Sequence, residues 1–138
     1  IAERVVELLK ESGFELTEKK EWNPIRKPRI HFRDLSNKER ETFVKENPSY
    51  GRVICRCEFV TEGEILDALN APIPPKTYDA VKRRTWLGTG RCQGAFDLPR
   101  VVEILSRELG VSRLEITKKG KGSQFLTGTK ITESAKRS

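Results

Sequence analysis

Helix start and stop signals in the middle of the chain constrain its fold most. Thr61 and Glu64 have the spacing of a capping box, in which each side chain bonds the other residue's backbone N–H. Val60 and Ile65 occupy the two positions of a hydrophobic staple around the same helix start. Together these signals predict a helix over about 62–70.

Two further helices are predicted by the residues that follow. A helix is expected over 77–85, after the proline-rich stretch 72–75 ends the first one. Another is expected from Asp97 to Gly110, because Pro99 suits a first helical turn and glycine suits a helix end. Its apolar residues recur at helical spacing: Val101, Val102, Ile104, Leu105 and Leu109. We therefore expect a mainly α fold built around a small helical module.

The supply of apolar side chains limits how much of the chain can be buried. Only 36% of the residues are hydrophobic and 34% are charged, so a core of roughly 60–80 residues is expected. No stretch approaches the roughly 18 consecutive apolar residues of a membrane span, and we expect none. Three cysteines fit a disulfide framework poorly, which favours a reducing compartment and a cytoplasmic location.

The chain is expected to divide into three parts. Residues 1–49 would hold a helix over 1–10, an extended proline-punctuated linker, and a short helix opened by a Ser36–Glu39 capping box. Residues 50–112 would form the helical module. The remainder, 113–138, is a basic tail with 7 basic and 2 acidic residues. The chain contains no Met, so we expect it to be part of a longer protein.

The tail also contains two weak strand candidates, at 114–117 and 124–126, separated by residues typical of turns. Its positive charge is compatible with contact to nucleic acid or a membrane surface, but solvated lysines are the commoner explanation of such a tail.

The cysteines carry the chemistry of the sequence. Cys55 and Cys57 are two residues apart after an extended stretch, so their side chains are expected on the same side and within reach of one metal centre. The alternative is a pair of buried structural thiols. Cys92 lies in a glycine-rich loop over 87–94, where the backbone can approach a bulky centre and direct N–H groups at sulfur. The spacing alone supports a metal or cluster site.

Basic residues occur near these cysteines. Arg52, Arg56, Arg91 and the basic run 82–84 could offset the negative charge of a thiolate-ligated cluster, or form a solvated basic face. With Lys76, the run 82–84 also suits a small basic helix-turn-helix-like nucleic-acid-binding domain. The central module is nearly neutral, however, so nucleic acid is not the favoured partner.

Five segments occur in an order typical of one family. They read ICRCE, VTEGEI, VKRRT, GRCQG and PRVV, between residues 54 and 102. The chain resembles the bacterioferritin-associated-ferredoxin-like [2Fe–2S] domain over about 50–112. More narrowly, it is similar to the version at the C-terminus of FAD-dependent glycerol-3-phosphate dehydrogenases and related oxidoreductases. The flanking NPSYG and KKGKGS segments also look like that group.

The resemblance implies a cluster held by a C-x-C and a C-x4-C motif. Cys55, Cys57 and Cys92 match the first three ligands, but Asp97 stands where the fourth cysteine is expected. In one interpretation, Asp97 ligates the cluster through a carboxylate oxygen. In another, Asp97 caps the following helix and the cluster has been lost. In a third, three thiolates and one carboxylate hold zinc.

The resemblance also implies a function. The chain would be a non-catalytic accessory module that relays electrons or supports the structure. FAD would be bound in a domain absent from this sequence, where a small substrate such as glycerol 3-phosphate is oxidised. The expected partners are that flavin-binding domain and an electron acceptor, either a protein or a quinone.

Overall fold

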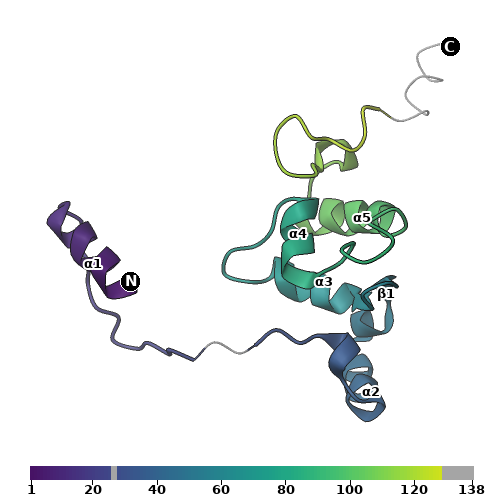
Figure 1. The fold of residues 1–138 in the computed structure, drawn as a ribbon, viewed down its shortest axis with the longest axis horizontal. Coiled ribbons are helices and arrows are strands. Elements are labelled where there is room, and N and C mark those ends of the chain that lie inside the picture. Colours follow the sequence, from purple (N-terminus) through teal and green to yellow (C-terminus); the bar gives the residue numbers. More distant parts are fainter. Residues whose placement is uncertain (26–27, 129–138) are drawn as a thin grey trace.

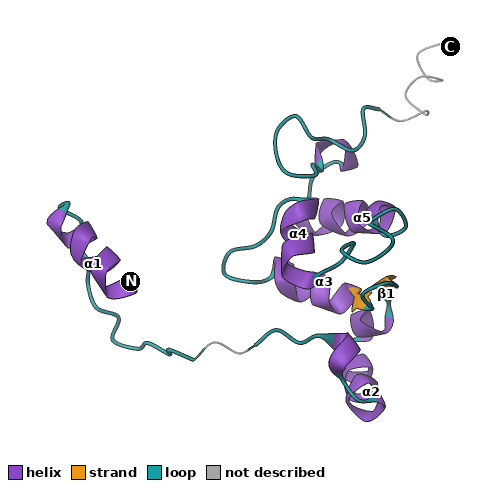
Figure 2. Ribbon diagram, in the orientation of Figure 1, coloured by secondary structure: helices purple, strands orange, loops and turns teal. Residues whose placement is uncertain are grey.

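The protein is mainly helical in a computed structural model that describes residues 1–25 and 28–128. The helices of this described part are α1 (Ala2–Glu11), α2 (Asn37–Glu46), α3 (Glu62–Leu69), α4 (Tyr78–Thr85) and α5 (Leu98–Leu109) (Figure 1). One antiparallel hairpin joins β1 (Val53–Cys55) to β2 (Val60–Thr61), as Figure 2 shows. Three short 3-10 turns complete the fold: Phe32–Asp34, Pro48–Gly51 and Arg113–Glu115. The expectation of a mainly α fold is confirmed.

The core lies between α3, α4 and α5. The apolar face predicted for the last helix is buried there, and side chains from the hairpin and the tail complete it. The buried cluster contains Cys55, Val60, Ile65, Tyr78, Val81, Leu87, Val101, Val102, Ile104, Leu105 and Ile116. Burying apolar surface is the main stabilising contribution to such a fold, and it holds Cys55 in this core with Cys92 packed against it.

Helix capping accounts for where α2 and α3 begin. Both predicted capping boxes are formed, with the Ser36 hydroxyl accepting from the Glu39 N–H and the Thr61 hydroxyl accepting from the Glu64 N–H. Substituting such a cap by Ala costs about 0.5–2 kcal/mol. The backbone N–H of Glu62 also donates to the Arg52 carbonyl at 2.8 Å, which attaches the start of α3 to the hairpin.

Helix α1 lies apart from the other helices (Figure 1). The sequence predicted it correctly, yet none of its residues is buried. Its apolar stripe, which includes Val5, Leu8 and Leu9, is exposed to solvent. Within the described ranges, each helix is too short or too polar to be a membrane-spanning segment.

The tail differs from its predicted strands. Residues Arg113–Glu115 form a 3-10 turn, because Ser112 and Glu115 make a further capping box that bends the backbone out of the extended conformation. In the described part of the tail, strand-like pairing is limited to one isolated bridge between Thr117 and Gln124. The strand expected over 114–117 is therefore wrong, and 124–126 contributes only that bridge. Residues 129–138 of the tail lie outside the described part.

The tail nevertheless packs against the start of α4. The Tyr78 N–H donates to the Thr117 carbonyl at 3.1 Å, and the Asp79 N–H donates to the Lys118 carbonyl at 2.9 Å. These are first-turn N–H groups that have no partner within their own helix. The ammonium of Lys118 also lies 2.9 Å from the Asp79 carboxylate.

Candidate metal centre

Three potential ligands come together from separate parts of the module. Cys55 ends β1, Cys92 lies in the loop between α4 and α5, and Asp97 directly precedes α5. Their sulfur and oxygen ligand atoms all lie within 4.8 Å of one another. Cys55 and Asp97 are each only 1% exposed, whereas Cys92 is half-buried. Two thiols and a carboxylate thus share one partly enclosed site.

The Asp97 carboxylate faces this site and leaves the start of α5 uncapped. Oδ1 accepts a hydrogen bond from the Tyr78 hydroxyl at 2.8 Å, and Oδ2 lies 3.8 Å from the Cys92 sulfur. Asp97 thus takes the predicted N-cap position, but its side chain makes no capping hydrogen bond and does not cap α5. A buried carboxylate that lies between a phenol and a thiol is well placed to act as a metal ligand.

Cys55 is held by the glycine-rich loop. Its sulfur accepts a hydrogen bond from the Gly88 N–H at 3.3 Å, which confirms that this loop can direct a backbone donor at sulfur. Burial raises the pKa of the Cys55 thiol, and the hydrogen bond from Gly88 opposes that shift by stabilising the thiolate. A bound cation would favour the thiolate further.

Tyr78 is the site residue that the sequence analysis missed. Gly88 (φ +69°) and Gly94 (φ +86°) both close around its hydroxyl, and an added Cβ at Gly88 would lie 2.6 Å from that oxygen. An added Cβ at Gly94 would collide with the same oxygen. Burial, followed by the hydrogen bond to Asp97, raises the pKa of Tyr78, so the phenol stays a donor. The ring of Phe125 packs edge-on against Tyr78 with its centroid at 5.6 Å.

Cys57 does not join the three gathered ligands. β1 ends at Cys55, so the alternation of an extended strand does not continue to Cys57, which lies exposed in the hairpin turn. Its Cβ is close to the glycine-rich loop, since an added Cβ at Gly90 would approach it to 2.8 Å. Cys57 and Cys92 both line a surface groove of about 1180 Å³. Cys57 is thus at the rim of the site.

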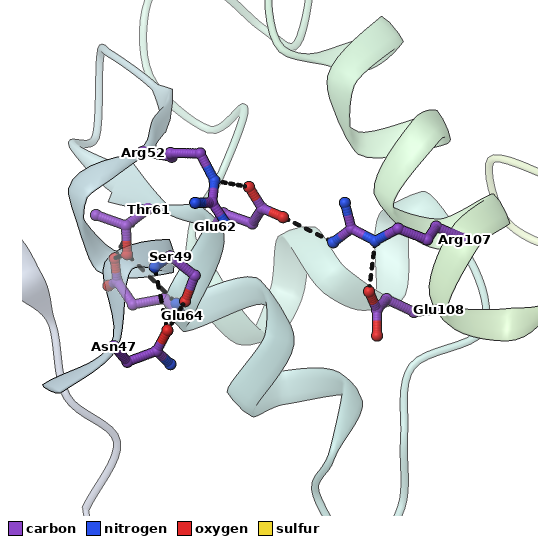
Figure 3. A network of polar contacts seen from close by, with 8 residues as sticks. All are labelled: Asn47, Ser49, Arg52, Thr61, Glu62, Glu64, Arg107 and Glu108. Atoms are coloured by element: carbon purple, nitrogen blue, oxygen red, sulfur yellow. Dashed lines mark hydrogen bonds and ion pairs between the residues drawn. The ribbon is translucent and has the colours of Figure 1, made fainter. Parts of the chain in front are cut away.

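A polar network fixes the wall of this groove (Figure 3). The buried Glu62 carboxylate accepts from Arg52 Nε at 2.5 Å and from Arg107 Nη2 at 2.7 Å, joining the hairpin, α3 and α5. The hydrogen bond from Arg52 is the main reason why the pKa of Glu62 lies below its ordinary value. Arg52 therefore pairs with Glu62, and it is not available in the role proposed from the sequence, as a free charge beside the cysteines.

The other basic residues divide between two faces. Arg56 and Arg91 line the same groove as Cys57 and Cys92. Lys82 and Arg83, from the basic run on α4, line a different hollow beside Trp86. The basic run is thus not part of the groove that holds the cysteines.

The residues present fit a [2Fe–2S] cluster in three respects. Such a cluster takes thiolate ligands, and two thiols and a carboxylate converge here. A backbone N–H donates to sulfur, as clusters of this kind require for tuning. Glycines 88, 90 and 94 keep side chains away from the loop that carries Cys92. The same set of donors also suits zinc.

Comparison with known proteins defines the class of this module. Residues 53–107 match the family of BFD-like [2Fe-2S] binding domains. The chain is also similar to a glycerol 3-phosphate dehydrogenase from Caloramator mitchellensis, with 46% identity over 129 residues. That similarity covers 94% of the chain but only 27% of the relative's length. No solved structure matches the chain significantly.

Proposed function

We propose that this chain is the iron–sulfur module of an FAD-dependent glycerol-3-phosphate dehydrogenase-like oxidoreductase and that it relays single electrons. The observation that carries the proposal is the convergence of Cys55, Cys92 and Asp97 in a BFD-like domain. A [2Fe–2S] cluster supplies a centre that accepts and donates one electron at a time.

Each residue of the site has a defined part in this proposal. Cys55, Cys92 and Asp97 would hold the cluster from the buried side, and Cys57 would complete the ligand set from the rim. Tyr78 fixes Asp97 by donating to Oδ1, which leaves Oδ2 directed toward Cys92. The Gly88 N–H stabilises negative charge on the Cys55 sulfur.

The partners follow from the similarity to a longer protein. The relative is almost four times as long as the matched region, so the proposed parent chain has room for a flavin-binding domain. That domain would oxidise glycerol 3-phosphate through FAD, and an acceptor protein or quinone would receive the electrons. The exposed apolar stripe of α1 suits packing against the same parent chain. We place the protein in the cytoplasm.

The test is metal and sulfide analysis of protein purified and reconstituted without oxygen, together with its visible spectrum. The proposal expects iron and sulfide in equal amounts, about two of each per chain. Asp97→Ala should lose or strongly weaken iron binding. Asp67→Ala is the matched control, because Asp67 also accepts a tyrosine hydroxyl but is exposed and outside the site.

Two results would contradict the electron-relay function. Zinc at one ion per chain without iron would show a structural zinc module, since the donor set also suits tetrahedral zinc. A colourless wild-type protein whose Asp97→Cys variant turns brown would show a cluster pocket that has been retained only as structural support.

A further inference from the structure

The groove that contains Cys57 and Cys92 carries a concentration of positive charge. Five arginines line it, together with two acidic residues: Arg52, Arg56, Arg91, Arg100, Arg107, Glu62 and Glu103. Both carboxylates are already paired. Glu62 accepts from two of these arginines (Figure 3), and Glu103 lies 3.1 Å from Arg113 Nη2 outside the groove.

Three of the arginines are left without a carboxylate partner. Within the described part of the chain, Arg56, Arg91 and Arg100 form no ion pair or side-chain hydrogen bond, and all three are exposed. Their charges are therefore directed at solvent and available to a ligand on this face. An unneutralised group of like charges focuses the electrostatic field and attracts partners of the opposite sign.

The same groove contains a large exposed aromatic side chain. Phe96 lies between Cys92 and Asp97 in the sequence and is 87% exposed. Aromatic and arginine side chains are the residue types enriched at the centre of protein interfaces. Phe96 directly precedes the buried Asp97, so it is exposed although it lies beside the core and not at the tip of a distant loop.

We propose that this face, defined by Arg56, Arg91, Phe96 and Arg100, docks the acidic surface of a separate one-electron carrier protein. This proposal rests on the proposed electron relay and adds the surface through which electrons leave the module. Electron transfer requires donor and acceptor to be close, and the exposed Cys57 and half-buried Cys92 are on this face. Complementary charge would raise the rate of encounter more than the final affinity.

The charge arrangement favours an acidic protein over nucleic acid. A phosphate backbone needs a continuous line of cations, whereas here Glu62 and Glu103 interrupt the wall of the groove. The unpaired arginines and Phe96 instead combine charge with apolar contact, as a protein interface does.

The experiment measures binding and electron transfer with two carriers of opposite charge. Flavodoxin, with negative net charge, is the probe, and cytochrome c, with positive net charge, is its counterpart. Titration calorimetry gives binding with or without the cluster, and stopped-flow absorbance gives the rate of transfer from the reduced reconstituted protein. Arg91→Glu/Arg100→Glu is the groove variant. Arg83→Glu/Lys121→Glu changes the net charge equally at exposed positions that do not line the groove.

The proposal expects flavodoxin to react faster than cytochrome c, with a rate that falls about 10-fold in the groove variant at low ionic strength. The control variant should stay within about 2-fold, and added salt should remove the difference. The docking proposal would be overturned if the two variants had equal effects or if cytochrome c reacted faster than flavodoxin. It would also be overturned if added duplex DNA displaced flavodoxin. A protein that binds flavodoxin but no iron would refute the proposed function while leaving the docking surface intact.

Discussion

Replacing Tyr78 with Phe removes one oxygen atom from the centre of the site. That oxygen donates to Asp97 Oδ1 at 2.8 Å, and Asp97 is 1% exposed. Water cannot easily replace the lost donor, so a charged acceptor would be left buried. Hydrogen bonds to charged groups contribute about 1.5–3 kcal/mol, and we expect Tyr78→Phe to lower the free energy of unfolding by about 2 kcal/mol.

Tyr50 provides a matched comparison within the same chain. It is as buried as Tyr78, and its hydroxyl also donates to an aspartate, Asp67. Asp67 is exposed, however, so water can solvate its carboxylate after the substitution. Tyr50→Phe should therefore cost only about 0.5–1 kcal/mol, the ordinary net value of a hydrogen bond.

The assay is urea unfolding of both variants, metal-free and under reducing conditions at pH 7. Thermal unfolding gives an independent measure, because 1 kcal/mol shifts the melting temperature of a small domain by about 4–8 °C. Equal losses in the two variants would refute the argument that burial of the acceptor sets the cost. A smaller loss in Tyr78→Phe than in Tyr50→Phe would refute it more strongly.

Three further changes test other parts of the structure. The pKa of Glu62 is lowered in the folded protein, so this carboxylate stabilises the fold above its ordinary pKa of 4.5, and that stability is lost as the pH falls through the folded pKa. Glu62→Gln should therefore make the free energy of unfolding fall less steeply below about pH 4.5. Urea midpoints measured across this pH range check the prediction. Gly94→Ala should lower the free energy of unfolding by about 1–3 kcal/mol more than Gly110→Ala, measured in urea. Both glycines have positive φ, but only at Gly94 would the added Cβ collide with a side chain, that of Tyr78. Equal costs of the two substitutions would contradict this argument. Ser36→Ala should cost about 1 kcal/mol by loss of the α2 cap, and an unchanged urea midpoint would show that α2 does not contribute to the cooperative unit.

Most of the helical fold could be predicted because its signals are local. The Thr61–Glu64 capping box and the Pro99–Gly110 pair both act within a few residues, and each marks a helix end in the structure. The prediction failed at 114–117, because the Ser112–Glu115 capping box turns the backbone there into a 3-10 turn. Apolar alternation cannot distinguish a short strand from a turn when the turn has its own cap.

The site could be predicted only in part. Cys92 was predicted from its glycine-rich loop, and Asp97 because the family resemblance implies a ligand at its position; the structure places Asp97 Oδ2 3.8 Å from the Cys92 sulfur. The direction of the Asp97 side chain depends on its backbone, which is αR (φ −90°, ψ −23°) and not the extended conformation that N-cap residues adopt. Tyr78 could not be found, because its role comes from a tertiary contact with residues 10 and more positions away.

The contact between the tail and α4 has a consequence for where this module can be cut. The family match ends at residue 107, but the first-turn N–H groups of Tyr78 and Asp79 bond carbonyls at 117 and 118. Phe125 also covers the ring whose hydroxyl holds Asp97. Proteolysis or truncation between α5 and residue 117 would therefore remove contacts that hold Tyr78 in place, and the position of Asp97 should be disturbed although the matched segment stays intact.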